Sequence, residues 1–156
     1  MRGIRIGVRL GAVALVLLGT LMTAQAQAKP DLLVSRFHIQ EDSNGFVKQV
    51  TVKVTNVCTK ASSASYVLVS FKQSAEPGAK TIFTVGNTVK ALKGGESDIH
   101  IFPITDIKIG AGRHILVEAD PYKKVGEANE DNNWLTENPH QRPSKSSGTY
   151  QCTPKV

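Results

Sequence analysis

The stretch Arg113-His-Ile-Leu-Val-Glu-Ala-Asp-Pro-Tyr-Lys-Lys-Val-Gly-Glu-Ala-Asn-Glu-Asp-Asn-Asn-Trp-Leu135 decides the fold class. From Arg113 to Asp120 apolar and polar residues alternate, which is the period-two pattern of a half-buried strand. A polar connection follows, and an apolar pattern resumes at Trp134 and Leu135. The stretch therefore predicts strand, polar connection and strand, the last hairpin of an all-β domain.

The same alternation recurs upstream, with turn signals about every ten residues. Strands are expected around residues 33–39, 46–54, 66–71, 81–85, 89–92, 99–101 and 113–120, with 66–71 central because both of its faces are apolar. Gly86-Asn87 is interpreted as a turn, and Pro103 as the end of a strand. Seven or eight short antiparallel strands without helical spacing predict a β-sandwich.

The inward-facing positions of this pattern give a predicted core. It comprises Leu33, Phe37, Val50, Val52, Val54, Val67, Val69, Phe71, Leu92, Ile99, Ile101, Ile115, Val117 and Trp134.

Residues 1–28 have the composition of a secretory signal peptide. Three arginines precede the apolar run from Leu10 to Met22, and small residues around Ala26 and Ala28 offer cleavage positions. A transmembrane helix needs about 20 apolar residues, so an uncleaved anchor is the less favoured alternative. We expect a periplasmic or secreted protein with no membrane span after cleavage.

Cleavage leaves one domain at residues 29–138 and a polar tail at 139–156. The signal removes three of the 19 basic residues, so the net charge falls from +6 to about +3, which is 16 basic minus 13 acidic residues. The basic residues are scattered and form no run interleaved with aromatics. The composition therefore does not favour a nucleic-acid-binding protein.

Two cysteines, Cys58 and Cys152, remain in the mature chain. An even count in an exported protein predicts a disulfide; free thiols or a metal pair are the alternatives. In a sandwich, the last strand ends at the pole opposite Cys58. The segment from Thr136 to Cys152 must therefore run back along the domain, and it can span roughly 50 Å. We expect the tail to be a strap pinned by this disulfide.

The connection after Asp120 is rich in oxygen-bearing side chains. They are Asp120, Glu127, Asn129, Glu130, Asp131, Asn132 and Asn133. One interpretation is a turn held by bonds from side chains to backbone N–H groups; the other is a cation site suited to Ca²⁺. The EF-hand pattern does not fit, because Trp134 would occupy its glycine position. Tyr122 lies on the same connection and is a candidate binding residue, although packing on the sheet edge would also explain it.

Catalytic motifs are not evident. No Gly-x-Ser-x-Gly elbow is present, and no histidine is placed by a motif to activate a nucleophile. His100 and His114 could face each other on exposed strand surfaces, but two histidines make a weak metal site. A pair of catalytic carboxylates is still an alternative, because the sequence does not give the distances between carboxylate side chains in the fold. We expect no enzyme activity and no cofactor other than the Ca²⁺ considered above.

Several segments resemble the CARDB family, the cell-adhesion-related domain found in bacteria. The closing signature comprises Asp120, Val125-Gly-Glu127, Asn129-Glu130 and Asn132-Asn133, and similar segments are Asp31–Val34, Val52–Asn56, Leu92–Ser97 and Gly112–Asp120. The resemblance covers about residues 31–137 and does not include Cys58 and Cys152. It implies an immunoglobulin-like fold in an exported bacterial protein, and an adhesion or binding module without catalytic residues.

The expected function is that of an exported, non-catalytic module. We expect it to bind another protein or an envelope glycan, through loops at one pole or an open sheet edge. The alternative is a cation-stabilised structural subunit of a cell-envelope complex.

Overall fold

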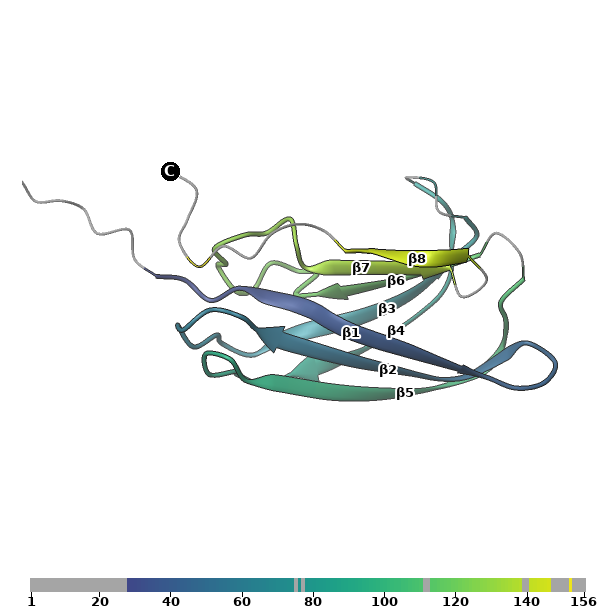
Figure 1. Ribbon diagram of the computed structural model, residues 1–156, viewed down its shortest axis with the longest axis horizontal. Helices are drawn as coiled ribbons and strands as arrows, with labels where there is room; N and C mark the ends of the chain where they lie inside the picture. Colours follow the sequence, from purple (N-terminus) through teal and green to yellow (C-terminus); the bar gives the residue numbers. More distant parts are fainter. Residues whose placement is uncertain are drawn as a thin grey trace, which may run out of the picture.

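The computed structural model describes residues 28–74, 76, 78–110, 113–138, 141–146 and 152. Within these residues the chain forms eight strands and no helix (Figure 1). The strands are β1 (Leu32–Glu41), β2 (Phe46–Asn56), β3 (Ser65–Lys72), β4 (Thr81–Val89), β5 (Ser97–Lys108), β6 (His114–Ala119), β7 (Trp134–Asn138) and β8 (Gln141–Ser146). The expected signal peptide lies, apart from Ala28, outside the described residues and stays a prediction. None of the described segments is a helix long and apolar enough to cross a membrane.

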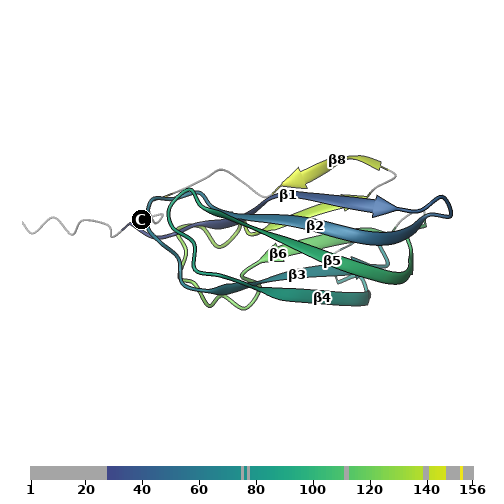
Figure 2. The same ribbon diagram turned by 90° about the horizontal axis from the view of Figure 1, so that it is seen from below.

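The eight strands form two sheets. One contains three strands in the order β1-β2-β5, and the other contains five in the order β4-β3-β6-β7-β8. Every pair of neighbours is antiparallel, and the strands of both sheets run along the long axis of the molecule (Figures 1 and 2). The predicted all-β sandwich of seven or eight antiparallel strands is confirmed.

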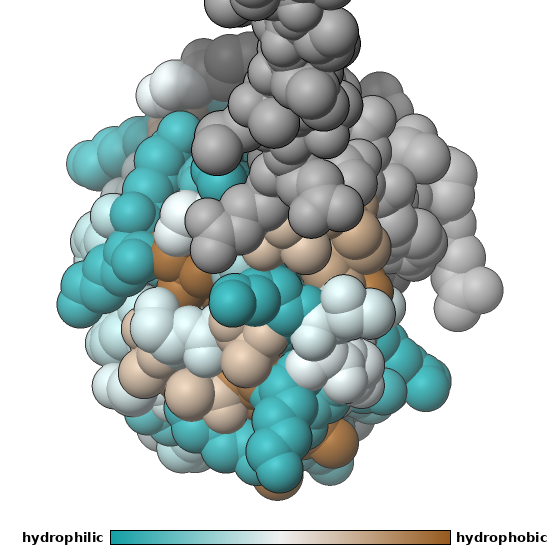
Figure 3. Space-filling model, turned by 90° about the vertical axis from the view of Figure 1, so that its left-hand side faces the viewer, coloured by the Kyte–Doolittle hydropathy of each residue, from teal (hydrophilic) through white to brown (hydrophobic). Residues whose placement is uncertain are grey.

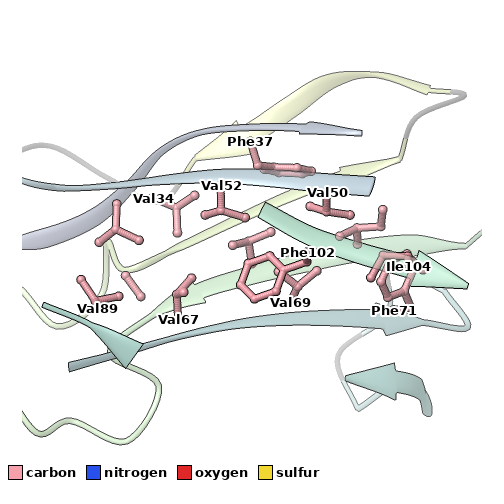
Figure 4. Close-up of a cluster of buried hydrophobic side chains, with 14 of the residues drawn as sticks. Val34, Phe37, Val50, Val52, Val67, Val69, Phe71, Val89, Phe102 and Ile104 are labelled. Carbon is pink, nitrogen blue, oxygen red and sulfur yellow. The ribbon is translucent and has the colours of Figure 1, made fainter. Parts of the chain in front are cut away.

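The core lies between the two sheets. Val50 and Val52 of β2 point toward Val67 and Val69 of β3, and all four side chains are fully buried (Figure 4). Burying one such side chain stabilises the fold by about 1.5–3 kcal/mol. Eleven predicted core residues are buried, namely Leu33, Phe37, Val50, Val52, Val54, Val67, Val69, Phe71, Leu92, Ile115 and Val117.

The core prediction is wrong for Ile99, Ile101 and Trp134. Their side chains are 61%, 60% and 38% exposed. In β5 the residues that face inward are instead His100, Phe102 and the following Ile104. Both alternating sets of this strand contain apolar residues, and a shift by one residue exchanges the two faces of a strand. The alternation alone therefore did not determine which face of β5 is buried.

Two predicted strand ends are also wrong. β4 continues through Gly86-Asn87, and β5 continues through Pro103. The N–H of Asn56 donates to the carbonyl of Glu96 at 3.0 Å, so the even-numbered residues of β5 direct their backbone groups toward β2. Pro103 is odd-numbered, and its missing N–H therefore falls on the free edge of the sheet, where no ladder bond is lost.

The C-terminal tail differs in one respect from the expected strap without secondary structure, because residues 141–146 form the strand β8. Register partners along β7 include Leu135 with Ser146 and Asn138 with Gln141, so β8 runs back antiparallel to β7. Cys152 then forms a disulfide with Cys58. The backbone pairing explains why the apolar pattern missed β8. An edge strand is held by hydrogen bonds from its neighbour and tolerates a proline.

Candidate functional site

The connection between β6 and β7 begins with a turn built by Asp120. This residue has a φ of 47°, a left-handed conformation in which Asp and Asn are enriched. Its carboxylate accepts the N–H groups of Lys124 at 3.1 Å and Val125 at 2.7 Å. Its own N–H donates to the carbonyl of Tyr66 at 2.8 Å. Asp120 therefore ties the connection both to itself and to β3.

Glu127 joins the same connection to the first strand. Its Oε1 accepts the N–H of Leu32 at 3.2 Å, and its Oε2 accepts the side-chain amide of Asn133. The side chain is 4% exposed. The pKa of Glu127 is raised from 4.5 to about 8, mainly by burial. The nearby carboxylates of Glu130 and Asp120 also raise this pKa, whereas the hydrogen bonds from Asn133 and Leu32 lower it. Glu127 is therefore mostly protonated at neutral pH.

A second chain of buried polar groups extends this pole. Asn132 donates to the Asp31 carboxylate at 3.0 Å, and the N–H of Asp31 donates to the Asn56 side chain at 3.2 Å. Asn56 also accepts the N–H of Cys58 at 3.2 Å and donates to the carbonyl of Leu92 at 3.2 Å. Asp31 and Asn56 were missing from the predicted site. In the sequence, these two residues were indicated only by their positions in two segments that resemble CARDB strands.

The geometry favours the turn interpretation of the connection. Oε1 of Glu130 accepts the N–H of Glu127, and Oδ1 of Asn129 accepts the N–H of Asp131, both at 3.1 Å. Together with Asp120, these side chains use their oxygens on local backbone groups. Across the described ranges no three His, Cys, Asp or Glu side chains are grouped so that they could hold a metal ion. Figure 3 views this pole, where hydrophilic residues (teal) are interspersed with smaller hydrophobic areas (brown).

A thermal melt tests the Ca²⁺ alternative. We expect the same midpoint in EDTA and in millimolar CaCl₂, because the oxygens of Asp120 and Glu127 already accept hydrogen bonds. A specific ion at one hundred times its Kd would stabilise the fold by about 2.7 kcal/mol. MgCl₂ at equal ionic strength is the control, and a rise of the midpoint with Ca²⁺ alone would establish a cation site.

Tyr122 is 60% exposed on this connection, as expected for a candidate binding residue. Its ring packs at 5.7 Å from the ring of Tyr66, and the ammonium of Lys124 lies 5.9 Å from its centroid. Gly86 on β4 makes room for this pair. A Cβ at that position would lie 2.3 Å from Cε1 of Tyr66, so only glycine lets the tyrosine ring lie over the neighbouring strand.

The outer surface of the five-stranded sheet brings further residues beside these rings. Leu68 is the register partner of Glu118, and Glu118 is the partner of Trp134. Glu118 is half-buried; burial raises its pKa, and the charge of Lys72 opposes this. We call the surface formed by Tyr66, Leu68, Glu118, Tyr122 and Trp134 the aromatic face. The sequence indicated Tyr66 and Tyr122 as candidate surface aromatics, but the prediction of Trp134 as a core residue was wrong and concealed the rest of this surface.

The two histidines expected on facing strands lie in different sheets. His100 is on β5 of the three-stranded sheet, and His114 is on β6 of the five-stranded sheet. His100 is buried rather than exposed, with its Nε2 3.3 Å from a carboxylate oxygen of Asp98. The expected pair of exposed cross-strand neighbours is therefore wrong.

Comparison with known proteins gives a family match and a similar solved structure. Residues 29–137 match the model of the CARDB family. The solution NMR structure of a domain of a cell surface protein from Methanosarcina acetivorans is similar, with a TM-score of 0.53 and 23% sequence identity. The match covers 79% of this chain and 94% of that chain. No curated protein matches. Since the family model spans most of the chain and the similar structure has the same fold, this protein belongs to the CARDB family.

Proposed function

We propose that this chain is an exported, non-catalytic binding module of the cell envelope, which recognises another protein or an envelope glycan. One observation carries the proposal, namely the aromatic face on the outer surface of the five-stranded sheet. Trp134 and Tyr122 are 38% and 60% exposed there, beside the half-buried Glu118. Tyrosine and tryptophan are the residues that most often dominate binding surfaces.

The free edge of β5 is a less suitable binding surface. Odd-numbered residues direct their backbone groups to this edge, but Pro103 has no N–H to offer. The N–H of Ile99 already donates to Oδ1 of Asp98 at 3.1 Å. Proline and charged side chains are the means by which natural sheets prevent edge pairing. The binding role is therefore assigned to the face of the other sheet.

The non-catalytic part of the proposal rests on how the buried acids are used. Asp120 accepts two backbone N–H groups, and Glu127 accepts one backbone and one side-chain donor. Both acids thereby hold the connection to β3 and β1. These are structural roles, and they support the proposal of a binding module.

Capture from an envelope extract of the host cell, followed by mass spectrometry and by a glycan array, tests the proposal. We expect the native protein to retain a partner that the Tyr122→Ala/Trp134→Ala variant does not retain. The matched control is Ile99→Ala/Ile101→Ala, which removes exposed apolar side chains from the opposite sheet. Loss of capture in the control, with capture intact in the aromatic variant, would contradict the proposed site.

A further inference from the structure

The carboxylate of Glu118 has an unusual place on the aromatic face. It comes from β6, between Leu68 on β3 and Trp134 on β7. Among the residues whose side chains the structure describes, no cation lies within ion-pair distance of it. Burial disfavours its charged form, and Lys72 compensates only through space. A half-buried carboxylate without a partner is complementary to a cation that arrives from outside.

An aromatic ring and an apolar side chain border this carboxylate. Trp134 is the register partner of Glu118 on β7, on one side, and Leu68 is its register partner on β3, on the other side. The face of an aromatic ring attracts an ammonium or guanidinium group, most strongly for tryptophan. The Lys124 ammonium near the Tyr122 ring is an example within this molecule.

The dimensions of the face suit a single side chain. Neighbouring strands lie about 4.8 Å apart, so β3 and β7 are separated by roughly 10 Å with Glu118 between them. Leu68 offers apolar surface beside the carboxylate. Lysine and arginine combine an apolar stem with a charged end group and bury the stem along such surfaces.

We infer that the aromatic face binds a lysine or arginine side chain presented by a partner protein, with Glu118 as the counter-ion, Trp134 as the flanking ring and Leu68 as apolar surface for the stem. This inference rests on the proposed function, since it specifies the chemistry of the same surface. A neutral glycan would use the rings but would gain nothing from the charge of Glu118.

Fluorescence of Trp134, the single tryptophan of the chain, reports on this site directly. The probes are Nα-acetyl-lysinamide and Nα-acetyl-argininamide, compared with the uncharged Nα-acetyl-norleucinamide and with N-acetylglucosamine. We expect the two cationic probes to change the emission in a saturable manner and to bind more weakly at high salt. Glu118→Gln should weaken their binding about tenfold, and norleucinamide should bind no better to the native protein than to this variant.

Each other result overturns the inference and is distinguishable from failure of the proposed function. Equal binding of lysinamide and norleucinamide, or no effect of Glu118→Gln, would remove the role of charge. Saturable binding of N-acetylglucosamine alone would identify a glycan site and leave the proposed function intact. No response to any probe at 100 mM would exclude the cation site, while capture from the extract would still decide the proposed function. An unchanged thermal midpoint of Glu118→Gln shows that the variant is folded.

Discussion

Raising the pH from 5 to 9 is expected to lower the free energy of unfolding by about 4 kcal/mol through Glu127 alone. The pKa of this buried acid is about 8 in the folded protein, against an ordinary value of 4.5. Below pH 4.5 the group is protonated in both states, and its contribution to stability is fully present. Between the two values the unfolded chain releases the proton more readily than the folded chain, so stability is lost until the pH exceeds about 8.

Glu127→Gln isolates this contribution. The glutamine side chain resembles the protonated acid, since its oxygen can accept the N–H of Leu32 and its amide can donate to Asn133. Oδ1 of Asn133 is buried and has no hydrogen-bond partner among the described residues, so a rotated amide would supply the acceptor. We therefore expect the variant to keep at pH 9 the stability that the native protein has at pH 5.

Denaturant titrations of both proteins at pH 5, 7 and 9 provide the measurement. At each pH, the free energy of unfolding of the variant is subtracted from that of the native protein. The contributions of all other titrating groups cancel in this difference, provided that they titrate alike in both proteins. Parallel pH profiles for the two proteins would contradict the expectation.

Loss of the Cys58–Cys152 disulfide is expected to lower the free energy of unfolding by about 2–4 kcal/mol. The bond closes a loop with a sequence separation of 94, and a loop of this length strongly restricts the unfolded chain. The disulfide also holds Cys152, which follows β8 in the chain, near the end of β2. Reduction should therefore weaken the pairing of β8 with β7 before the rest of the fold.

Guanidinium titration in the presence and absence of a phosphine reductant measures this effect, and hydrogen exchange of the β7 and β8 amides locates it. The Cys58→Ala/Cys152→Ala variant should match the reduced native protein and should not respond to reductant. An oxidised native protein that is no more stable than the variant would show that the bond adds nothing to the fold.

Much of the fold follows from the sequence because β2 has one consistent apolar alternation. Val50, Val52 and Val54 are all buried as predicted. β5 lacks this consistency, since Ile99 and Phe102 belong to opposite faces, and only pairing with β2 selects between them. β8 lacks an apolar pattern altogether, so its position depends on backbone pairing that no local signal encodes.

Only the contacts within the connection itself could be predicted from the sequence. Asp120 binds backbone groups four and five residues away, which is typical of turn-forming aspartates. Glu127, by contrast, binds Leu32 across 95 positions, and Glu118 meets Trp134 only through the register of β6 and β7. Contacts of this kind depend on the relative placement of strands, which residue spacing does not reveal.

The disulfide also determines how the molecule would respond to mechanical tension. A force applied between the two chain ends would pass through the Cys58–Cys152 bond, so the segment between these cysteines could not be stretched. Only β1 and β2 lie on the loaded path. Six of the eight strands, including those that carry the aromatic rings, would therefore bear no tension, and the force would act on β1 and β2 alone.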